Sequence, residues 1–258
     1  MPPNIQPDIQ PTQGNHYFEL IKTALIAGII ALTVRSVAYE PFSIPSSSMV
    51  PTLLIGDYLF VSKFSYGYSQ YSFPLAAIKF KGRINQHSPE RGDVIVFRKP
   101  TEPNIDYIKR LVGLPGDKIQ VRHGRLYINN KMMPREFVGE GLYDALNENN
   151  QMVAIKHKRY IETLPNGVQH QIIERADNFM LDNTQVFKVP PNHFFMMGDN
   201  RDGSQDSRVL NEVGFVPVEN LVGRAERLFF SVKEPYAGWQ FWLWPWSARF
   251  ERMLQAIK

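Results

Sequence analysis

One stretch constrains the fold of this chain more than any other: residues 20–39 are strongly apolar. Lys22 and Arg35 interrupt the run, and the uncharged residues between them are too few to cross a bilayer, which takes about 20. The full segment reaches that length if both charged side chains extend to opposite interfaces. We therefore predict one transmembrane helix over residues 19–39. A buried core helix is one alternative, and a signal peptide cleaved near Ser36-Val37-Ala38 is another.

The residues before this segment are rich in proline and polar amides, so we predict a disordered cytoplasmic tail over residues 1–18. Lys22 and Arg35 lie on opposite flanks of the helix and leave the positive-inside rule almost tied. A large folded domain that follows a first anchor usually lies outside the cytoplasm, and we expect that orientation here.

The composition excludes several classes of protein. The 258 residues include no cysteine, so disulfides, thiol nucleophiles and Cys-ligated metals are ruled out. The net charge of +4 comes from scattered basic residues, which suits an anionic membrane surface better than a nucleic acid. The 19 prolines and 17 glycines, with many β-branched and aromatic residues, favour a mainly β body.

A serine-rich stretch follows the apolar segment: Pro45-Ser46-Ser47-Ser48-Met49-Val50-Pro51-Thr52-Leu53. The two prolines limit helix on either side, so a hydroxyl here can lie on irregular backbone with free N–H groups nearby. A serine nucleophile needs that setting, because such N–H groups can stabilise an oxyanion. The alternative is a Ser/Pro linker, but Met49 and Leu53 are unusually apolar for one.

The remaining chain is predicted to form strands. Residues 105–113 form one strand that carries Lys109, with Tyr107, Lys109 and Leu111 on one face and Ile108 and Arg110 on the other. Hairpins are expected at Asn129-Asn130 and at Pro165-Asn166-Gly167, within an inserted β cap over residues 124–188. Residues 139–152 are polar and are expected to form a loop, and the last strand is expected over residues 221–232.

A dense polar loop, residues 198–208, follows the apolar run Phe194-Phe195-Met196-Met197. A Ca²⁺ loop is a poor interpretation because Arg201 and Arg208 intrude and the terminal glutamate is missing. Acids that alternate with arginines instead suit a buried salt-bridge network that braces a site. All four tryptophans lie within residues 239–246, where a membrane-interfacial segment and a terminal helix docked on the core are both possible.

Three stretches, in this order after an apolar anchor, resemble the bacterial type I signal peptidases, which are membrane-anchored Ser/Lys proteases. The likeness covers roughly residues 40–230. The stretches are Pro45-Ser46-Ser47-Ser48-Met49 with Pro51-Thr52-Leu53 and Gly56-Asp57, Asp106-Tyr107-Ile108-Lys109-Arg110 with Gly113-Leu114-Pro115-Gly116-Asp117, and Gly198-Asp199-Asn200-Arg201-Asp202 with Ser204, Asp206, Ser207 and Arg208. Ser47 is a departure, since glycine is frequent at that position.

The resemblance implies a role for each matching residue. Ser48 is the nucleophile, Lys109 is the general base, and Ser46 Oγ with the Ser48 N–H forms the oxyanion hole. Ser204 orients Lys109, and the bracing salt bridges are Asp199 with Arg110 and Asp206 with Arg208. Lysine acts as a base only when neutral, which burial can achieve by lowering its pKa. No metal or other cofactor is expected.

The implied substrate is the signal peptide of an exported preprotein, bound as an extended strand with small residues at positions −1 and −3. We expect its two shallow pockets to be lined by Phe42, Ile44, Leu53, Tyr107 and Ile108. The resemblance implies a fold with an N-terminal transmembrane helix and an antiparallel β-sheet catalytic domain over residues 40–123 and 189–232, interrupted by the inserted β cap. Residues 233–258 would form a Trp-rich interfacial segment. It also implies a bacterial inner membrane location, with the catalytic domain on the periplasmic side and the secretion translocon as a candidate partner.

Two other functions fit parts of the sequence. A soluble Ser/Lys self-cleaving repressor would share the β core, but residues 20–39 are a poor DNA-binding domain. A membrane-tethered β adaptor would explain the anchor and the tryptophans but leaves Ser48, Lys109 and Ser204 unexplained. An organellar homologue is a further alternative, which the sizeable insertion disfavours.

Overall fold

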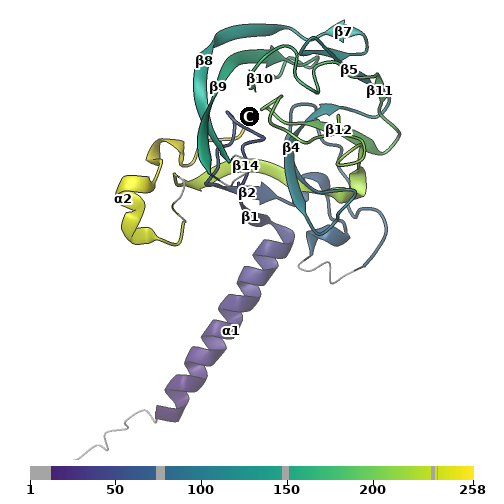
Figure 1. The fold of residues 1–258 in the computed structure, drawn as a ribbon. Coiled ribbons are helices and arrows are strands. Elements are labelled where there is room, and N and C mark those ends of the chain that lie inside the picture. The colour runs from purple at the N-terminus through teal and green to yellow at the C-terminus, as the bar shows by residue number, and fades with distance from the viewer. Residues whose placement is uncertain (1–12, 74–78, 147–150, 234–235, 237) are drawn as a thin grey trace, which may run out of the picture.

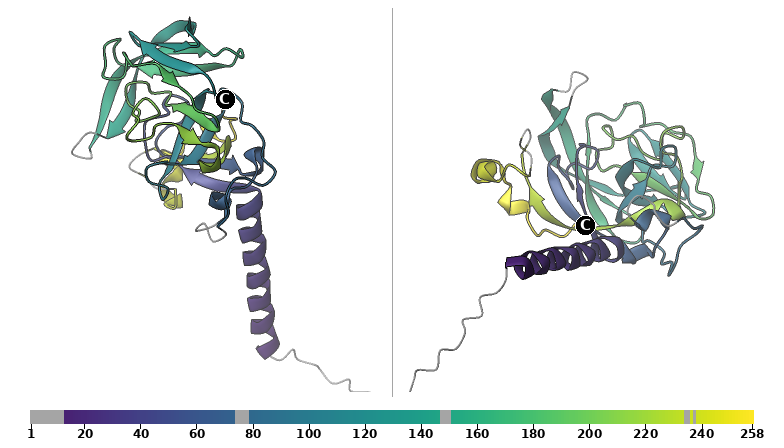
Figure 2. Two further views of the ribbon diagram at one scale, coloured as in Figure 1. Left: turned by 90° about the vertical axis from the view of Figure 1, so that its right-hand side faces the viewer. Right: turned by 90° about the horizontal axis from the view of Figure 1, so that it is seen from below.

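The fold is a body of curved antiparallel β-sheets from which one long helix projects (Figure 1). It comes from a computed structural model that describes residues 13–73, 79–146, 151–233, 236 and 238–258. The helix, α1 (Gln13–Val37), stands clear of the body in every view (Figure 2). Residues 16–37 of it, with a mean hydropathy of 1.8, are long and apolar enough to cross a membrane, and none of them is buried.

The helix differs from its predicted bounds at both ends. It begins at Gln13, so residues 13–18 are helical and do not belong to a disordered tail, whose first 12 residues lie outside the described part. It ends at Val37, because Tyr39 already pairs with Ser62 in the sheet and Arg35 closes an ion pair with Glu40 at 2.8 Å. A helix satisfies all its backbone hydrogen bonds internally, which is what a lipid-facing segment requires.

The main sheet has seven strands in the order β1-β2-β14-β3-β4-β12-β13. Neighbouring strands in it are antiparallel. Its strands are β1 (Tyr39–Ser43), β2 (Asp57–Ser62), β14 (Leu221–Ser231), β3 (Val94–Arg98), β4 (Asp106–Gly113), β12 (His193–Met197) and β13 (Val216–Pro217). The predicted strands around Lys109 and at residues 221–232 are therefore confirmed. β4 lies between β3 and β12, so the lysine strand is central and rigid.

Two smaller sheets form the other half of the body. One has the order β10-β9-β8, with β8 (Arg135–Leu146), β9 (Met152–Thr163) and β10 (Gln169–Glu174). The other has the order β11-β5-β6-β7, with β5 (Lys118–Arg122), β6 (Arg125–Ile128), β7 (Lys131–Met132) and β11 (Phe187–Lys188). Both predicted hairpins are present, and Asn129, Asn130 and Gly167 adopt the positive φ that their tight turns require.

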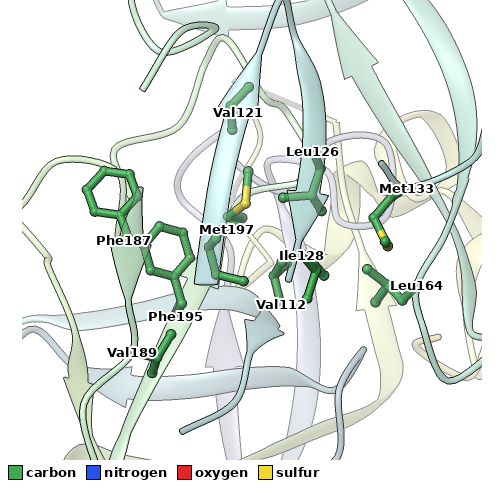
Figure 3. Close-up of a cluster of buried hydrophobic side chains, with 11 residues drawn as sticks. Val112, Val121, Leu126, Ile128, Met133, Leu164, Phe187, Val189, Phe195 and Met197 are labelled. Carbon is green, nitrogen blue, oxygen red and sulfur yellow. The ribbon is translucent and has the colours of Figure 1, made fainter. Parts of the chain in front are cut away.

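Two expectations for this half are wrong. Residues 139–152 are not a polar loop, because most of them belong to the long β8–β9 hairpin, in which cross-strand pairing overrides a weak local preference for strand. The four-stranded sheet β11-β5-β6-β7 also begins before the predicted cap boundary, at Lys118, and its buried side chains share one core cluster with those of the main sheet. Figure 3 shows Val112 from β4 and Phe195 and Met197 from β12 in one cluster with Val121, Leu126, Ile128 and Phe187.

The C-terminal segment both docks on the body and exposes aromatic side chains. After α2 (Trp244–Ser247), residues 254–257 pair with β14, where Leu254 N–H donates to the carbonyl of Leu228 and Ile257 N–H to that of Glu226. Trp244 packs against Phe230 with ring centroids 4.5 Å apart. The other three tryptophans are more than half exposed: Trp239, Trp242 and Trp246. The docked part of the segment agrees with the alternative that it packs on the core, and the membrane-interfacial role of the exposed tryptophans stays a prediction.

A buried carboxylate, Asp57, ties this segment to the start of β2. Its oxygens accept hydrogen bonds from Arg252 Nη2 at 2.6 Å, Ser231 Oγ at 2.6 Å and Leu54 N–H at 2.8 Å, and Arg249 Nη1 lies 3.6 Å away. The sequence places Asp57 only in a turn, so this role was missed. Asp57 links residues 195 positions apart, which no local pattern reveals.

We predict that Asp57→Ala lowers the free energy of unfolding by about 3 kcal/mol, because it removes a fully buried carboxylate that binds the partly buried Arg252 and the Ser231 hydroxyl. Urea unfolding of the full chain in detergent, followed by circular dichroism, measures this. Glu140→Ala is the matched control: its pair with Lys156 is exposed, and we expect a loss of about 1 kcal/mol at most. Equal losses in the two variants would show that Asp57 does not anchor the segment.

Candidate active site

The site forms where the serine-rich loop meets strand β4. Apolar side chains hold the loop: Met49 and Leu53 are fully buried and pack with Ile44, Leu59 and Val61. These anchors explain why the stretch is not a solvated linker. Ser48 precedes the buried Met49 and lines the open side of the site. It is only 7% exposed, and its Oγ is 3.2 Å from Ser46 Oγ.

Lys109 reaches Ser48 from the middle of β4. Its Nζ donates to Ser48 Oγ at 2.7 Å and to the Ile108 carbonyl at 3.0 Å, and it lies 5.1 Å from the centre of the Tyr107 ring. The side chain is 3% exposed. Burial lowers the pKa of Lys109 to about 8, although the nearby carboxylates of Asp206 and Asp199 oppose the shift. A useful fraction of the amine is therefore neutral near pH 7–8, as a general base requires.

Both predicted salt bridges are present and fully buried. Arg110 holds Asp199 with two parallel bonds, Nε to Oδ1 at 2.8 Å and Nη2 to Oδ2 at 2.7 Å. Arg208 holds Asp206 in the same way, at 2.8 and 2.9 Å. Burial acts to raise the pKa of each carboxyl, but the guanidinium beside it outweighs burial and keeps the pKa below its usual range. Both acids therefore stay ionised at neutral pH.

Two other predicted roles are only partly visible. Ser204 is buried beside Gly198, where an added Cβ would lie 2.2 Å from Ser204 Oγ and 2.6 Å from the Ser48 carbonyl oxygen. Its Oγ has no hydrogen-bond partner among the described residues, so a bond that orients Lys109 is not seen and that role stays a prediction. The oxyanion hole also stays a prediction, since no substrate oxygen is present to define it.

A cavity of about 560 Å³ opens in front of Ser48 and Lys109. Four of the five predicted wall residues line it: Phe42, Ile44, Tyr107 and Ile108. The fifth, Leu53, is wrong as a wall residue: it is fully buried and packs with Met49 beneath the loop, so it supports the wall without facing the cavity. Gly203 and Gln205 line the cavity as well, and the sequence reading had not assigned them.

No metal-binding constellation accompanies the site within the residues described. In that part of the chain, no three His, Asp or Glu side chains are placed to hold a metal ion together. The expectation that the chemistry needs no metal remains a prediction, which chelator treatment can test.

Known proteins resemble this chain closely. Residues 17–230 match the family described as "Signal peptidase, peptidase S26". Signal peptidase I of Rickettsia typhi is 44% identical over 212 residues, which cover 79% of this chain and 76% of that protein, and signal peptidase I of Rickettsia akari is 45% identical over the same shares. A crystal structure of a signal peptidase I from Enterococcus faecalis aligns with 54% of this chain and 97% of that one, at 26% identity and a TM-score of 0.30.

These matches and the sheet topology define the protein as a serine endopeptidase with a mainly β fold. More particularly, the chain belongs to the signal peptidase family, peptidase S26. This membership implies that exported preproteins are its substrates, and the apolar α1 fits a membrane anchor.

The lowered pKa of Lys109 generates a prediction for the pH dependence. Only the neutral amine accepts a proton, so kcat/KM should rise about tenfold per pH unit below pH 8 and level off above it. Initial rates of preprotein cleavage between pH 6 and 10 measure this, with circular dichroism at each pH as a control for folding. A rate that keeps rising to pH 10 would mean that burial does not tune this lysine.

Proposed function

We propose that this protein removes signal peptides by acyl transfer through a Ser48/Lys109 dyad, cutting after small residues at positions −1 and −3. One observation carries the proposal: Lys109 Nζ and Ser48 Oγ lie 2.7 Å apart in a place from which most water is excluded. The distance lets the neutral amine take the hydroxyl proton as Ser48 attacks the scissile carbonyl. The resulting ammonium then protonates the leaving amine.

The oxyanion of the tetrahedral intermediate is assigned to Ser46 Oγ and the Ser48 main-chain N–H. Within the described residues this N–H donates to no other group, and Ser46 Oγ lies beside Ser48 Oγ. Donors aimed at the oxyanion stabilise the charge that develops in the transition state, and loss of one typically costs about 10²–10³ in rate.

The specificity for small side chains follows from the cavity in front of the dyad. A substrate strand would lie between residues 42–48 and the start of β4, since both segments line the cavity. Phe42, Ile44 and Ile108 offer apolar walls, and in this proposal they admit a small side chain such as alanine and exclude a larger one. Alternate residues of an extended peptide point to the same side, which explains selection at −1 and −3.

Membrane attachment would keep this chemistry close to the point at which signal peptides leave the bilayer. In this proposal α1 spans the inner membrane of a bacterium, and the body lies on the periplasmic side, where the translocon delivers preproteins. The aromatic side chains nearest α1 support it: Tyr39, Phe60 and Phe64 are exposed and contact one another just beyond the helix end. Three tryptophans of the C-terminal segment are exposed as well: Trp239, Trp242 and Trp246.

The dyad is tested by two substitutions in the full chain. Ser48→Ala removes the nucleophile, and Lys109→Arg keeps the charge but cannot deprotonate in a protein. We expect both to reduce cleavage of a purified preprotein by more than about 10³-fold, with mass spectrometry placing the parent's cut after the −1 residue.

Lys99→Arg, a buried lysine of the same domain that pairs with Glu102 and Glu212, is the matched control and should cleave within about threefold of the parent. Substantial cleavage by Lys109→Arg at pH 8 would assign the base to another group.

The lipid contact is tested by fluorescence of single-tryptophan variants reconstituted in vesicles. We expect Trp246, which is exposed, to be quenched strongly by brominated lipids, because exposed tryptophans near a membrane anchor prefer the interface. Trp244 is the control, since its ring packs on Phe230 and its Nε1 donates to the Gly238 carbonyl. Quenching of Trp246 as weak as that expected for the packed Trp244 would place the segment away from the bilayer.

A further inference from the structure

The nucleophile loop depends on contacts from a segment far away in the sequence. Asn200 donates from its main-chain N–H to the Ser48 carbonyl and from Nδ2 to the Ser47 carbonyl, both at 3.1 Å. Thr52 Oγ1 donates to Asp199 Oδ2 at 2.5 Å. These bonds hold the loop on both sides of Ser48, so the position of the nucleophile follows the position of residues 199–200.

That segment is in turn bound to strand β10 of the smaller sheet. Ile173 N–H donates to the Asp199 carbonyl at 2.9 Å, and Arg201 N–H donates to the Ile173 carbonyl at 3.0 Å. The Ile173 side chain is fully buried and packs with Val50 of the nucleophile loop. The sheet of β8, β9 and β10, part of the predicted β cap, therefore contacts the nucleophile loop and residues 199–201 directly.

A buried histidine on β10 completes this connection. His170 Nδ1 lies 3.3 Å from Asp199 Oδ1, and its Nε2 lies 3.4 Å from Glu162 Oε2. Both distances lie within ion-pair range, although neither ring nitrogen makes a hydrogen bond of good geometry among the described residues. The ring therefore lies wedged in contact with two buried carboxylates.

Glu162 is itself held by Arg201, with bonds of 2.9 and 2.5 Å. Burial acts to raise the pKa of Glu162, but Arg201, with a smaller effect of the neighbouring His170, outweighs it and lowers the pKa to about 2. A line of polar contacts thus runs from Arg201 through Glu162, His170 and Asp199 to Arg110, which is the neighbour of Lys109.

We propose that His170 is a positioning residue for the reaction: it fixes the Asp199 carboxylate, and through Asp199 and Thr52 it fixes the loop that carries Ser48. The proposal rests on the proposed function of Ser48. Asp199 Oδ1 is shared between Arg110 Nε and His170, and Oδ2 is shared between Arg110 Nη2 and Thr52. Without His170 the carboxylate keeps Arg110 but can turn about it, and the bond to Thr52 loosens.

The consequence is a catalytic effect without a binding effect, because His170 does not line the substrate cavity. A displacement of the nucleophile by about 1 Å can cost about 10²-fold in rate. We therefore expect His170→Leu to lower kcat about 10–100-fold while KM stays within about threefold of the parent. His170→Gln keeps one N–H donor and should restore kcat to within about fivefold of the parent.

The matched control is His157→Leu. His157 is the other buried histidine of this sheet, on β9, and it packs against the Tyr143 ring without an ion pair to Asp199 or Glu162 in the described part of the chain. We expect its kcat to stay within about twofold of the parent. Assays use the full chain in detergent at a temperature where circular dichroism shows each variant to be folded.

A second variant keeps the proposal testable if His170→Leu does not fold. Thr52→Val cuts the link between Asp199 and the loop without changing the β8–β10 sheet, and it should reproduce the loss in kcat. Where His170→Leu folds, its combination with Thr52→Val should cost less than the product of the two single losses, because both act through one carboxylate.

Three results would overturn the proposal: parental kcat in His170→Leu or in Thr52→Val, an equal loss in His157→Leu, or independent effects of Thr52→Val and His170→Leu. A parent that does not cleave, or a Ser48→Ala variant that does, would instead contradict the proposed function.

Discussion

The rest of this structure depends on holding a lysine amine out of water beside a serine hydroxyl. Lowering the pKa of Lys109 from 10.5 to about 8 corresponds to roughly 3 kcal/mol of preference for the neutral amine. β4 lies within the sheet between β3 and β12, and Lys109 is 3% exposed, so water reaches it only from the cavity in front of Ser48. The same environment that disfavours the ammonium keeps the amine available as a base.

The polar loop that follows β12 has the opposite electrostatic requirement. Its buried carboxylates remain ionised, whereas burial favours the neutral form of Lys109. Asp199 and Asp206 each receive a bidentate arginine, so their carboxylates stay ionised within reach of Lys109. Gly198 lets this loop approach closely, since a side chain there would overlap Ser204 and the Ser48 carbonyl. Residues 198–208 therefore set both the electrostatics around Lys109 and the position of Ser48.

Apolar side chains are distributed differently in the body and in α1. Inside the body, one cluster of buried side chains from β4, β5, β6 and β12 packs the four-stranded sheet against the main sheet (Figure 3). Outside it, α1 and several aromatic side chains remain exposed, including Phe60, Phe64 and Trp246. Exposed apolar patches of this kind mark contact surfaces, and their position beside the anchor favours lipid.

The sequence by itself indicated the long apolar helix and the mainly β class, from the length of an apolar run and the alternation around Lys109. Acids interleaved with arginines indicated a buried salt-bridge network, and the resemblance of the motifs named its two ion pairs. The matching motifs also named Ser48 and Lys109, because each lies at a recognisable position within its own stretch. Their separation in space, 2.7 Å, is a property of the fold.

Only the tertiary structure decided the long-range contacts. Leu53 is a core residue and not a pocket wall, the β8–β9 strands form across a stretch with weak local preference, and Asp57 and His170 acquire partners far along the chain. Thr52 and Asp199 are 147 residues apart, and nothing in either stretch indicates the other. The physical reason is that local pattern reports how a segment is built, whereas burial and pairing depend on which distant segments the sheet brings beside it.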